Sequence, residues 1–209
     1  MEYHNPVLLK ETVDGLNMNP SGVYVDVTFG GGGHSREIMS RLGKNGKLFA
    51  FDQDLDALKN AIDDERFTLI NENFRYIKRF LRFHGIKQVD GILADLGVSS
   101  HQFDVAERGF STRFDAELDM RMNQKGDVSA YHVVNEYDEQ DIARVLFDYG
   151  ELKNARAMAN VIVTARKDKE IRNSDELKKV LAKFLPGHKS NKILAQIYQA
   201  IRIEVNQEM

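Results

Sequence analysis

Residues 23–34 read Val-Tyr-Val-Asp-Val-Thr-Phe-Gly-Gly-Gly-Gly-His, and this stretch decides the fold. An apolar run rich in β-branched and aromatic residues, which is typical of a buried strand, ends abruptly in four glycines. A helical pattern then begins at Ser35, with apolar residues at positions 38, 39 and 42. A strand, a glycine turn and a helix in this order bring backbone N–H groups against a ligand, because glycine lacks the Cβ that would block the approach.

An acidic residue stands at the end of the next strand-like run, residues 47–52. Asp52 follows Gly33 by 19 residues. An acid about 20 residues beyond a glycine turn is where a ribose hydroxyl is usually held. The spacing therefore predicts a nucleoside-containing ligand.

The first half of the chain alternates strand and helix patterns. Strand-like runs cover 23–29, 47–52, 67–71 and 89–96, and helical patterns cover 35–42, 54–62 and 77–85. Apolar strands that alternate with helices predict an α/β protein with a doubly wound, mostly parallel sheet covered on both faces. The glycine turn, Asp52 and Asp95 all fall at carboxyl ends of strands, where such sheets bind ligands.

The second half has a different organisation. Residues 98–137 are irregular apart from a short helix at 130–135, and such a long irregular stretch is typical of an active-site loop or lid. From Glu139 onward the pattern is helical, and Ser174 is the expected N-cap of one of the helices. We expect a ligand-binding domain of residues 1–104 plus about 191–209, and an inserted helical subdomain of residues 105–190. Because a doubly wound sheet normally continues with further strands, we expect the first domain to be C-terminally truncated.

Composition narrows the class of protein. The 209 residues contain no cysteine, which excludes disulfides, zinc–thiolate sites and cysteine nucleophiles. No apolar run reaches the roughly 18 residues of a membrane span, and no signal segment is recognisable, so we expect a cytoplasmic protein that uses no membrane. We also expect no metal, because no two of the six histidines stand four residues apart. The net charge is −3, yet residues 144–192 hold 12 Lys/Arg against 6 Asp/Glu. This excess indicates either a polyanionic partner or solvated helix faces.

Two ligands suit the glycine turn. The dinucleotide pattern G-x-G-x-x-G/A is matched in part, because Ser35 stands at its third position. The stretch from Asp26 to Gly32 is similar to the acid-x-G-x-G-x-G loop of class I methyltransferases, with Thr28 at the first glycine. In that reading the loop holds the aminocarboxyl group of S-adenosyl-L-methionine, and the helix N-terminus suits the carboxylate.

Five blocks in fixed order carry a resemblance across the whole chain. They are Asp26-Val-Thr-Phe-Gly-Gly-Gly-Gly-His-Ser35, Asp95-Leu-Gly-Val-Ser-Ser100, Glu107-Arg-Gly-Phe-Ser111, Leu118-Asp-Met-Arg-Met122 and Gln199-Ala-Ile-Arg-Ile203. Together they resemble the MraW/RsmH family of bacterial small-subunit ribosomal RNA (cytosine-N4) methyltransferases. The resemblance implies a Rossmann-like sheet, S-adenosyl-L-methionine as cofactor, and methylation of the exocyclic N4 amine of a cytosine in 16S ribosomal RNA, naked or in the small subunit.

The resemblance also implies roles for individual residues. Those expected to bind the cofactor are Gly32, Gly33, His34, Asp52, Phe74, Asp95 and Gln102. Asp95 is also the candidate catalytic residue, because a carboxylate can accept a hydrogen bond from the amine, although it could equally serve only the cofactor's amino group. The target base must be splayed out of folded RNA, and Phe103, Phe110 and Phe114 are candidates to stack on it.

The candidate RNA contacts are cations of the irregular loop and the helical subdomain: Arg108, Arg113, Arg166, Lys167, Lys169 and Arg172. Arg121 has a competing explanation, an ion pair with Asp119. Two alternative functions are a nicotinamide-dependent oxidoreductase and a non-catalytic RNA-binding or ribosome-assembly factor. Whether the protein forms a homodimer is left open by the sequence.

Overall fold

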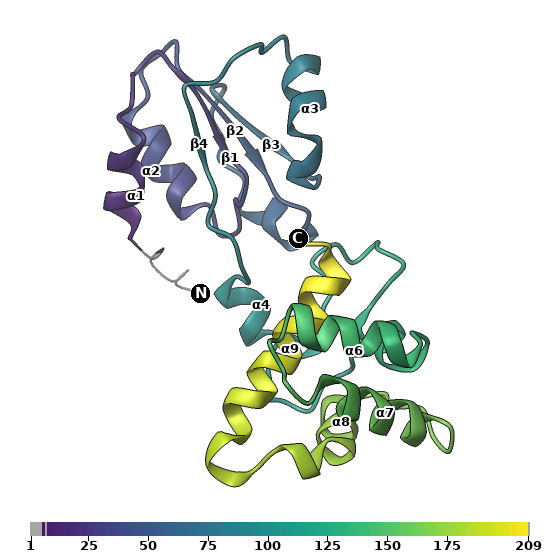
Figure 1. Cartoon of the computed structure of the whole chain (residues 1–209). Helices are drawn as coiled ribbons and strands as arrows, with labels where there is room; N and C mark the ends of the chain where they lie inside the picture. Colours follow the sequence, from purple (N-terminus) through teal and green to yellow (C-terminus); the bar gives the residue numbers. More distant parts are fainter. Residues whose placement is uncertain (1–5, 7, 209) are drawn as a thin grey trace. The chain divides into compact units, whose positions relative to one another are not determined.

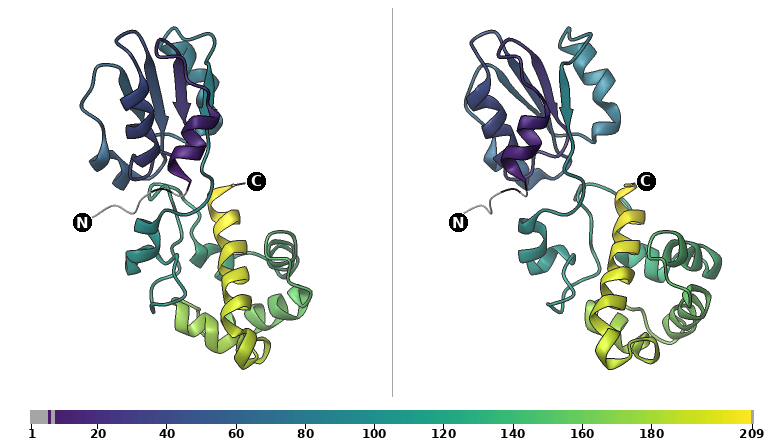
Figure 2. Two further views of the ribbon diagram at one scale, coloured as in Figure 1. Left: turned by 90° about the vertical axis from the view of Figure 1, so that its left-hand side faces the viewer. Right: turned by 60° about the vertical axis from the view of Figure 1, so that its left-hand side comes forward.

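The computed structural model describes residue 6 and residues 8–208. The chain forms two compact units, residues 1–99 and 100–209, which are treated separately below. Figures 1 and 2 show that the first unit contains the sheet and that the second is helical.

The first unit is built on a four-stranded parallel sheet, as the sequence predicts. Its strands are β1 (Val23–Asp26), β2 (Lys47–Phe51), β3 (Phe67–Ile70) and β4 (Gly91–Leu93), in the order β3-β2-β1-β4. Val25 of β1 lies opposite Phe49 of β2 and Ile92 of β4. The strands are shorter than the apolar runs, but the fold class is confirmed, and the carboxyl ends of all four strands meet at one edge.

Helices cover both faces of this sheet (Figure 1). On one face, α1 (Leu9–Gly15) and α2 (Gly33–Arg41) share a core with Tyr24, Leu48 and Leu93. On the other face, α3 (Ile77–Phe83) packs on Val25, Phe49 and Phe51, and follows the short 3₁₀ helix η2 (Phe74–Tyr76).

One predicted α-helix is a 3₁₀ helix. Within residues 54–62 the structure has the 3₁₀ helix η1 (Leu55–Asn60), whose N-cap Asp54 accepts a hydrogen bond from the Asp56 N–H. Extended backbone at Ala61 ends the helix after six residues. The apolar spacing of the segment predicts a helix but does not distinguish the 3₁₀ type from the α type.

The second unit is helical. Its elements are α4 (Ser100–Asp104), η3 (Ala106–Arg108), α5 (Ala130–Asn135), α6 (Glu139–Asp148), α7 (Ala155–Arg166), α8 (Ser174–Val180), η4 (Ala182–Phe184), η5 (Gly187–Lys189) and α9 (Ser190–Asn206). Helix α9 packs against α5 and α6. The described part of 191–209 therefore groups with the second unit, which differs from the division expected from the sequence.

The expectation that Ser174 caps a helix is also wrong. The N-cap of α8 is Asn173, whose side chain accepts a hydrogen bond from the Glu176 N–H. Ser174 is fully buried and its hydroxyl donates to the Ala116 carbonyl instead. Both residue types cap helices well, so local sequence alone does not choose between them.

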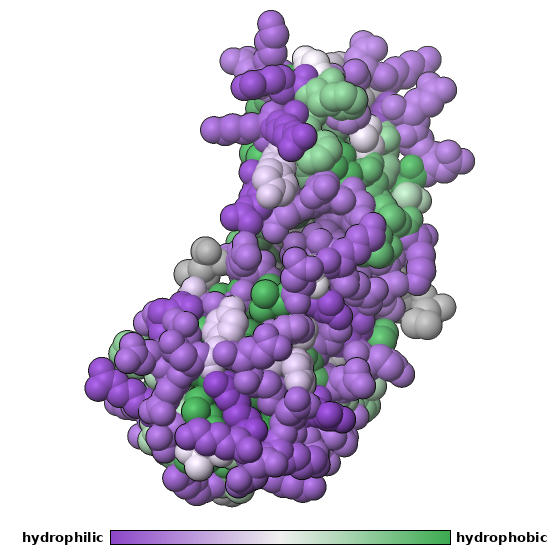
Figure 3. Space-filling model, turned by 90° about the vertical axis from the view of Figure 1, so that its right-hand side faces the viewer, coloured by the Kyte–Doolittle hydropathy of each residue, from purple (hydrophilic) through white to green (hydrophobic). Residues whose placement is uncertain are grey.

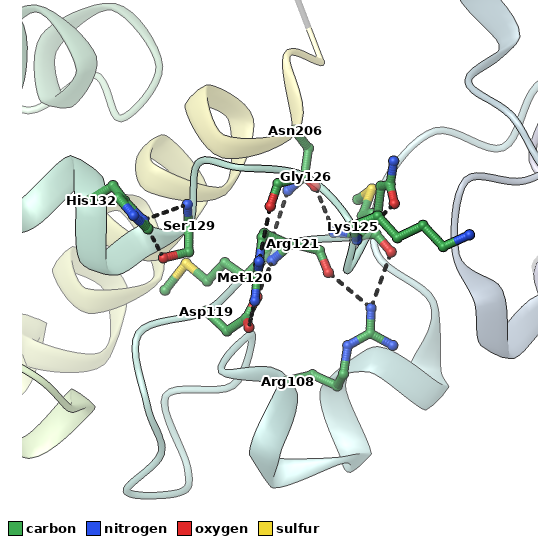
Figure 4. A network of polar contacts seen from close by, with 11 residues as sticks. Arg108, Asp119, Met120, Arg121, Lys125, Gly126, Ser129, His132 and Asn206 are labelled. Carbon is green, nitrogen blue, oxygen red and sulfur yellow. Dashed lines mark hydrogen bonds and ion pairs between the residues drawn. The ribbon is translucent and has the colours of Figure 1, made fainter.

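A network of polar contacts fixes the loop that precedes α5 (Figure 4). Arg121 forms an ion pair of 2.7 Å with Asp119, which confirms that competing explanation. Asn206, at the end of α9, accepts a hydrogen bond from the Met122 N–H and donates to the Met120 carbonyl, both at 2.7 Å. The end of α9 is thereby joined to a loop more than 80 residues earlier in the chain.

We predict that Asn206→Ala lowers the free energy of unfolding by about 1–3 kcal/mol, because the Met122 N–H and the buried Met120 carbonyl lose their hydrogen bonds to the Asn206 side chain. Urea denaturation measures the change. Asn191→Ala, at an exposed position of the same helix, is the matched control and should leave stability unchanged. Equal denaturation midpoints for the two variants would show that the contact does not hold the loop.

Candidate cofactor-binding site

The glycine turn joins β1 to α2. Gly30 and Gly32 have positive φ angles of 50° and 76°, which favour glycine, and Gly32 is the N-cap of α2. A Cβ on Gly32 would lie 2.9 Å from the Phe29 ring, and one on Gly33 would lie 2.2 Å from Cγ of Pro6. A Cβ on Gly30 would meet no described atom within 4 Å. Gly32 and Gly33 therefore have no room for a side chain, whereas there is free space beside Gly30.

The buried side chain of Asp26 fixes this turn through hydrogen bonds. Its side chain is fully buried at the end of β1, where one carboxylate oxygen accepts from the Thr28 N–H at 3.0 Å and the other accepts from the Ser35 hydroxyl at 2.7 Å. Burial raises the pKa of Asp26, and the hydrogen bonds from Ser35 and Thr28 oppose that rise. The strand, the turn and the first turn of α2 thus share one acceptor.

Asp52 joins the turn to the next strand. Its carboxylate accepts from the Gly30 N–H at 2.7 Å and from the Asp54 N–H at 2.9 Å. Burial raises the pKa of Asp52, while these two backbone hydrogen bonds lower it. A carboxylate has about four lone-pair sites, so Asp52 keeps acceptor capacity for hydroxyl groups of a ligand. Asn71, after β3, donates to the Asp52 carbonyl at 2.9 Å.

Asp95 follows β4 and reaches the same turn through its backbone. Its N–H donates to the Thr28 hydroxyl oxygen at 2.8 Å, and the residue is exposed. Thr28 therefore connects the buried Asp26 to the segment after β4. The threonine occupies the position at which the acid-x-G-x-G-x-G pattern has its first glycine, and here it has a structural use.

Phe74 begins η2, just after β3, and is 41% exposed. The neighbouring Asn73 donates a hydrogen bond of 3.2 Å to the Gln53 side chain, next to Asp52. An exposed aromatic ring at this strand end is a suitable surface for a flat heterocycle. In the first unit, the expected cofactor residues therefore follow the ends of neighbouring strands.

The residues present fit a cofactor with an aminocarboxyl group at one end and a nucleoside at the other. His34 is buried, and its Nε2 has no hydrogen-bond partner among the described residues. No described side chain caps the N-terminus of α2, so its first N–H groups suit a carboxylate. Asp52 and Phe74 supply a hydroxyl acceptor and an aromatic face. Gln102 belongs to the second unit, where it is buried in α4.

The structure gives two of the predicted RNA contacts a different role. Arg108 is 5% exposed, and its guanidinium donates to the carbonyls of Arg121 and Met122 (Figure 4). Arg166 donates to the carbonyls of Val134 and Tyr137, near the end of α5. Sequence reasoning missed these roles because a guanidinium that binds backbone carbonyls looks the same in sequence as an exposed one.

The other predicted RNA contacts are exposed but mostly paired. Arg113 forms an ion pair with Asp104, Lys169 with Glu176, and Arg172 with Glu170. Lys167 is exposed. Among the aromatic candidates, Phe110 is buried beneath the Arg108 guanidinium, so it is unsuited to stack on a base, whereas Phe103 and Phe114 are exposed.

Two general findings concern the described residues. They contain no group of three or more His, Asp or Glu residues that could hold a metal ion. None of their helices combines the length and the apolar character that a membrane span requires.

The parallel sheet, the glycine turn and the acids at the strand ends define an α/β protein with the Rossmann-like fold of methyltransferases. Comparison with known proteins gives the family: residues 1–209 match the MraW methylase family, and the chain belongs to it. It is 78% identical over 209 residues to the ribosomal RNA small subunit methyltransferase H of Flavobacterium johnsoniae. The matched region covers 100% of this chain and 69% of the relative. Proteins of the same name from Christiangramia forsetii and Bacteroides thetaiotaomicron are 67% and 56% identical, with the same two coverages.

We predict that Asp52→Ala weakens binding of S-adenosylhomocysteine by about 1–3 kcal/mol, because the ligand's hydroxyl groups lose an acceptor. Isothermal titration calorimetry measures the affinity. Asp63→Ala removes an exposed carboxylate of the same unit and should leave the affinity unchanged. Wild-type affinity in Asp52→Ala would mean that the end of β2 is not part of the site.

We predict that Thr28→Val also weakens S-adenosylhomocysteine binding, by about 2- to 10-fold, because the Asp95 N–H loses its acceptor, a loss equal to one hydrogen bond. Thr28→Ser keeps the hydroxyl and should restore the affinity. If Thr28→Val binds S-adenosylhomocysteine as tightly as Thr28→Ser does, the hydrogen bond between the turn and the segment after β4 does not affect ligand binding.

Proposed function

We propose that this protein transfers a methyl group from S-adenosyl-L-methionine to the exocyclic N4 amine of a cytosine in 16S ribosomal RNA. The observation that carries the proposal is the hydrogen bond between the Gly30 N–H and Asp52, which joins a glycine turn to a ribose-type acceptor in a chain of the MraW methylase family. The relatives are named for small-subunit ribosomal RNA, and we extend that substrate to this chain. A cytoplasmic location follows from the same substrate.

Different residues of the chain would bind different parts of the cofactor. Gly32, Gly33 and His34 would hold the methionine end at the start of α2, and Asp52 would accept from the ribose hydroxyls. Phe74 would lie along the adenine, and Asp95 would complete the part of the pocket that the first unit supplies. The bound cofactor supplies an activated methyl group on a sulfonium.

Asp95 has the chemistry that the amine requires. Cytosine N4 is a poor nucleophile because its lone pair is delocalised into the ring. A carboxylate that accepts a hydrogen bond from the amine favours the pyramidal geometry in which the lone pair becomes available, and positions it for attack. Asp95 is exposed, and its backbone is held by Thr28, so its carboxylate can face a substrate while the main chain stays fixed.

The second unit is proposed to recognise the RNA. Its exposed cations Arg113, Lys167, Lys169 and Arg172 can exchange the ion pairs that some of them make for contacts with phosphate. Exposed Phe103 and Phe114 are the remaining candidates to stack on the target base. No observation favours a nicotinamide cofactor or a purely structural role over this function.

The test supplies labelled S-adenosyl-L-methionine and small-subunit ribosomal RNA, both naked and as assembled subunits, to the purified protein. Mass spectrometry of RNA digests should find N4-methylcytosine. Asp95→Asn should lower kcat by about 10- to 150-fold, the worth of one hydrogen bond to a charged group, with a smaller change in KM for the cofactor. Methyl groups on another atom or another RNA, or none on any RNA, would contradict the proposal.

A further inference from the structure

The first unit has one segment that is rich in Lys and Arg and free of acids. This segment lies outside residues 144–192, over which the charge excess of the second half was counted. Residues 73–89 contain five Lys/Arg and no Asp/Glu, whereas the rest of that unit, residues 1–72 and 90–99, holds seven Lys/Arg and fourteen Asp/Glu. A segment without acids on an otherwise acidic unit indicates a polyanionic partner more strongly than net charge does.

The helix geometry places these cations on one side. Ile77, Phe80 and Leu81 of α3 face the sheet, at the spacing of one helix face. The outward residues of α3 and the turn after it are all exposed, and we call them the α3 basic face: Lys78, Arg79, Arg82, Phe83 and Lys87. Figure 3, which views the side of the molecule where α3 lies, shows apolar patches among projecting hydrophilic side chains on this unit.

Helix stability does not explain the arrangement. Lys78 and Arg82 are four residues apart, and Arg79 and Arg82 are three apart, so like charges are neighbours along α3, which disfavours the helix. Within the part of the chain that the structure describes, Lys78, Arg79, Arg82 and Lys87 make no ion pair. A face that serves only to be solvated would normally interleave acids with the cations.

An exposed aromatic ring accompanies the cations. Phe83 is 84% exposed, and its ring meets that of His84 edge-on at a centroid distance of 5.3 Å. Cations beside an exposed aromatic side chain are the combination with which proteins hold nucleic-acid strands: the cations neutralise phosphates, and the ring stacks on a base.

The cations of the second unit differ from these. Lys169 and Arg172 lie against Glu176 and Glu170, and Arg166 binds backbone carbonyls, so RNA would have to displace existing partners there. No such exchange is needed at the α3 basic face, where phosphate would replace only water and counterions.

We propose that the α3 basic face binds the phosphate backbone of RNA, with Phe83 stacking on an unpaired base. The identity of that RNA, the small-subunit ribosomal RNA, rests on the proposed function. The charge and geometry of the face do not depend on that function. The first unit then binds substrate RNA directly, in addition to holding the cofactor.

The test compares two double variants that each remove two positive charges. Lys78→Gln/Arg82→Gln alters the α3 basic face, and Lys10→Gln/Lys44→Gln removes two exposed lysines from α1 and from the turn after α2, elements that pack on the opposite face of the sheet. Affinity for small-subunit ribosomal RNA is measured between about 50 and 200 mM salt. The α3 variant should reduce the slope of log affinity against log salt by about 2, and the control should leave it unchanged.

Phe83→Ala tests the stacking step separately. It should weaken binding of single-stranded RNA about 5-fold or more without changing the salt slope. Retained S-adenosylhomocysteine binding and circular dichroism show that each variant is folded.

The outcomes separate this surface from the proposed function. If RNA binding shows the α3-specific salt effect but no cytosine is methylated, the surface stands and the function is wrong. Equal slopes for wild type and the α3 variant, or equal losses in the α3 and control variants, would overturn the surface even if methylation proceeds. An α3-specific loss of binding to vesicles containing phosphatidylglycerol, with RNA binding unchanged, would also overturn it.

Discussion

A buried carboxylate at the end of β1 is the constraint on which the rest of the site depends. Asp26 is shielded from water, and its carboxyl group is accommodated there because the Thr28 N–H and the Ser35 hydroxyl donate hydrogen bonds to it. Those donors come from the glycine turn and from α2, so satisfying Asp26 also sets the path of the turn. Thr28 extends the constraint to the segment after β4, and Asp52 binds the other side of the turn. One hydrogen-bonded, buried carboxyl group thereby helps to position groups that follow three strands.

This arrangement explains why much of the first unit could be predicted from sequence. Glycines at positive φ, an acid after β2 and apolar strand runs are local signals, because each is required by the geometry of its own segment. Parallel strands then bring their carboxyl ends together without any further information. The predicted strands were too long because an apolar run continues past the last paired residue of the strand. Val27 and Phe29 follow β1 and stay buried, and their N–H groups still donate to the carbonyls of Leu93 and Phe51.

The errors arose where a residue's role depends on distant parts of the chain. Arg108 and Phe110 looked like surface residues, yet both are buried. The Arg108 guanidinium donates to the loop that includes Arg121 and Met122, and that loop is itself held by Asn206 at the end of α9. Helix α9 follows the insertion in sequence but packs on α5 and α6. The cations of α3 were overlooked for a related reason: charge was counted over a long helical segment, and burial and pairing decide which charges are available.

Crystals grown with S-adenosylhomocysteine test the central interpretation most directly. Density for the ligand should run across the carboxyl ends of β1, β2 and β3, with its carboxylate at the first N–H groups of α2, its ribose hydroxyls on Asp52 and its adenine along Phe74. Density at another place on the unit, or a ribose whose hydroxyls avoid Asp52, would contradict the view that a buried Asp26 and the glycine turn it holds exist to seat this cofactor.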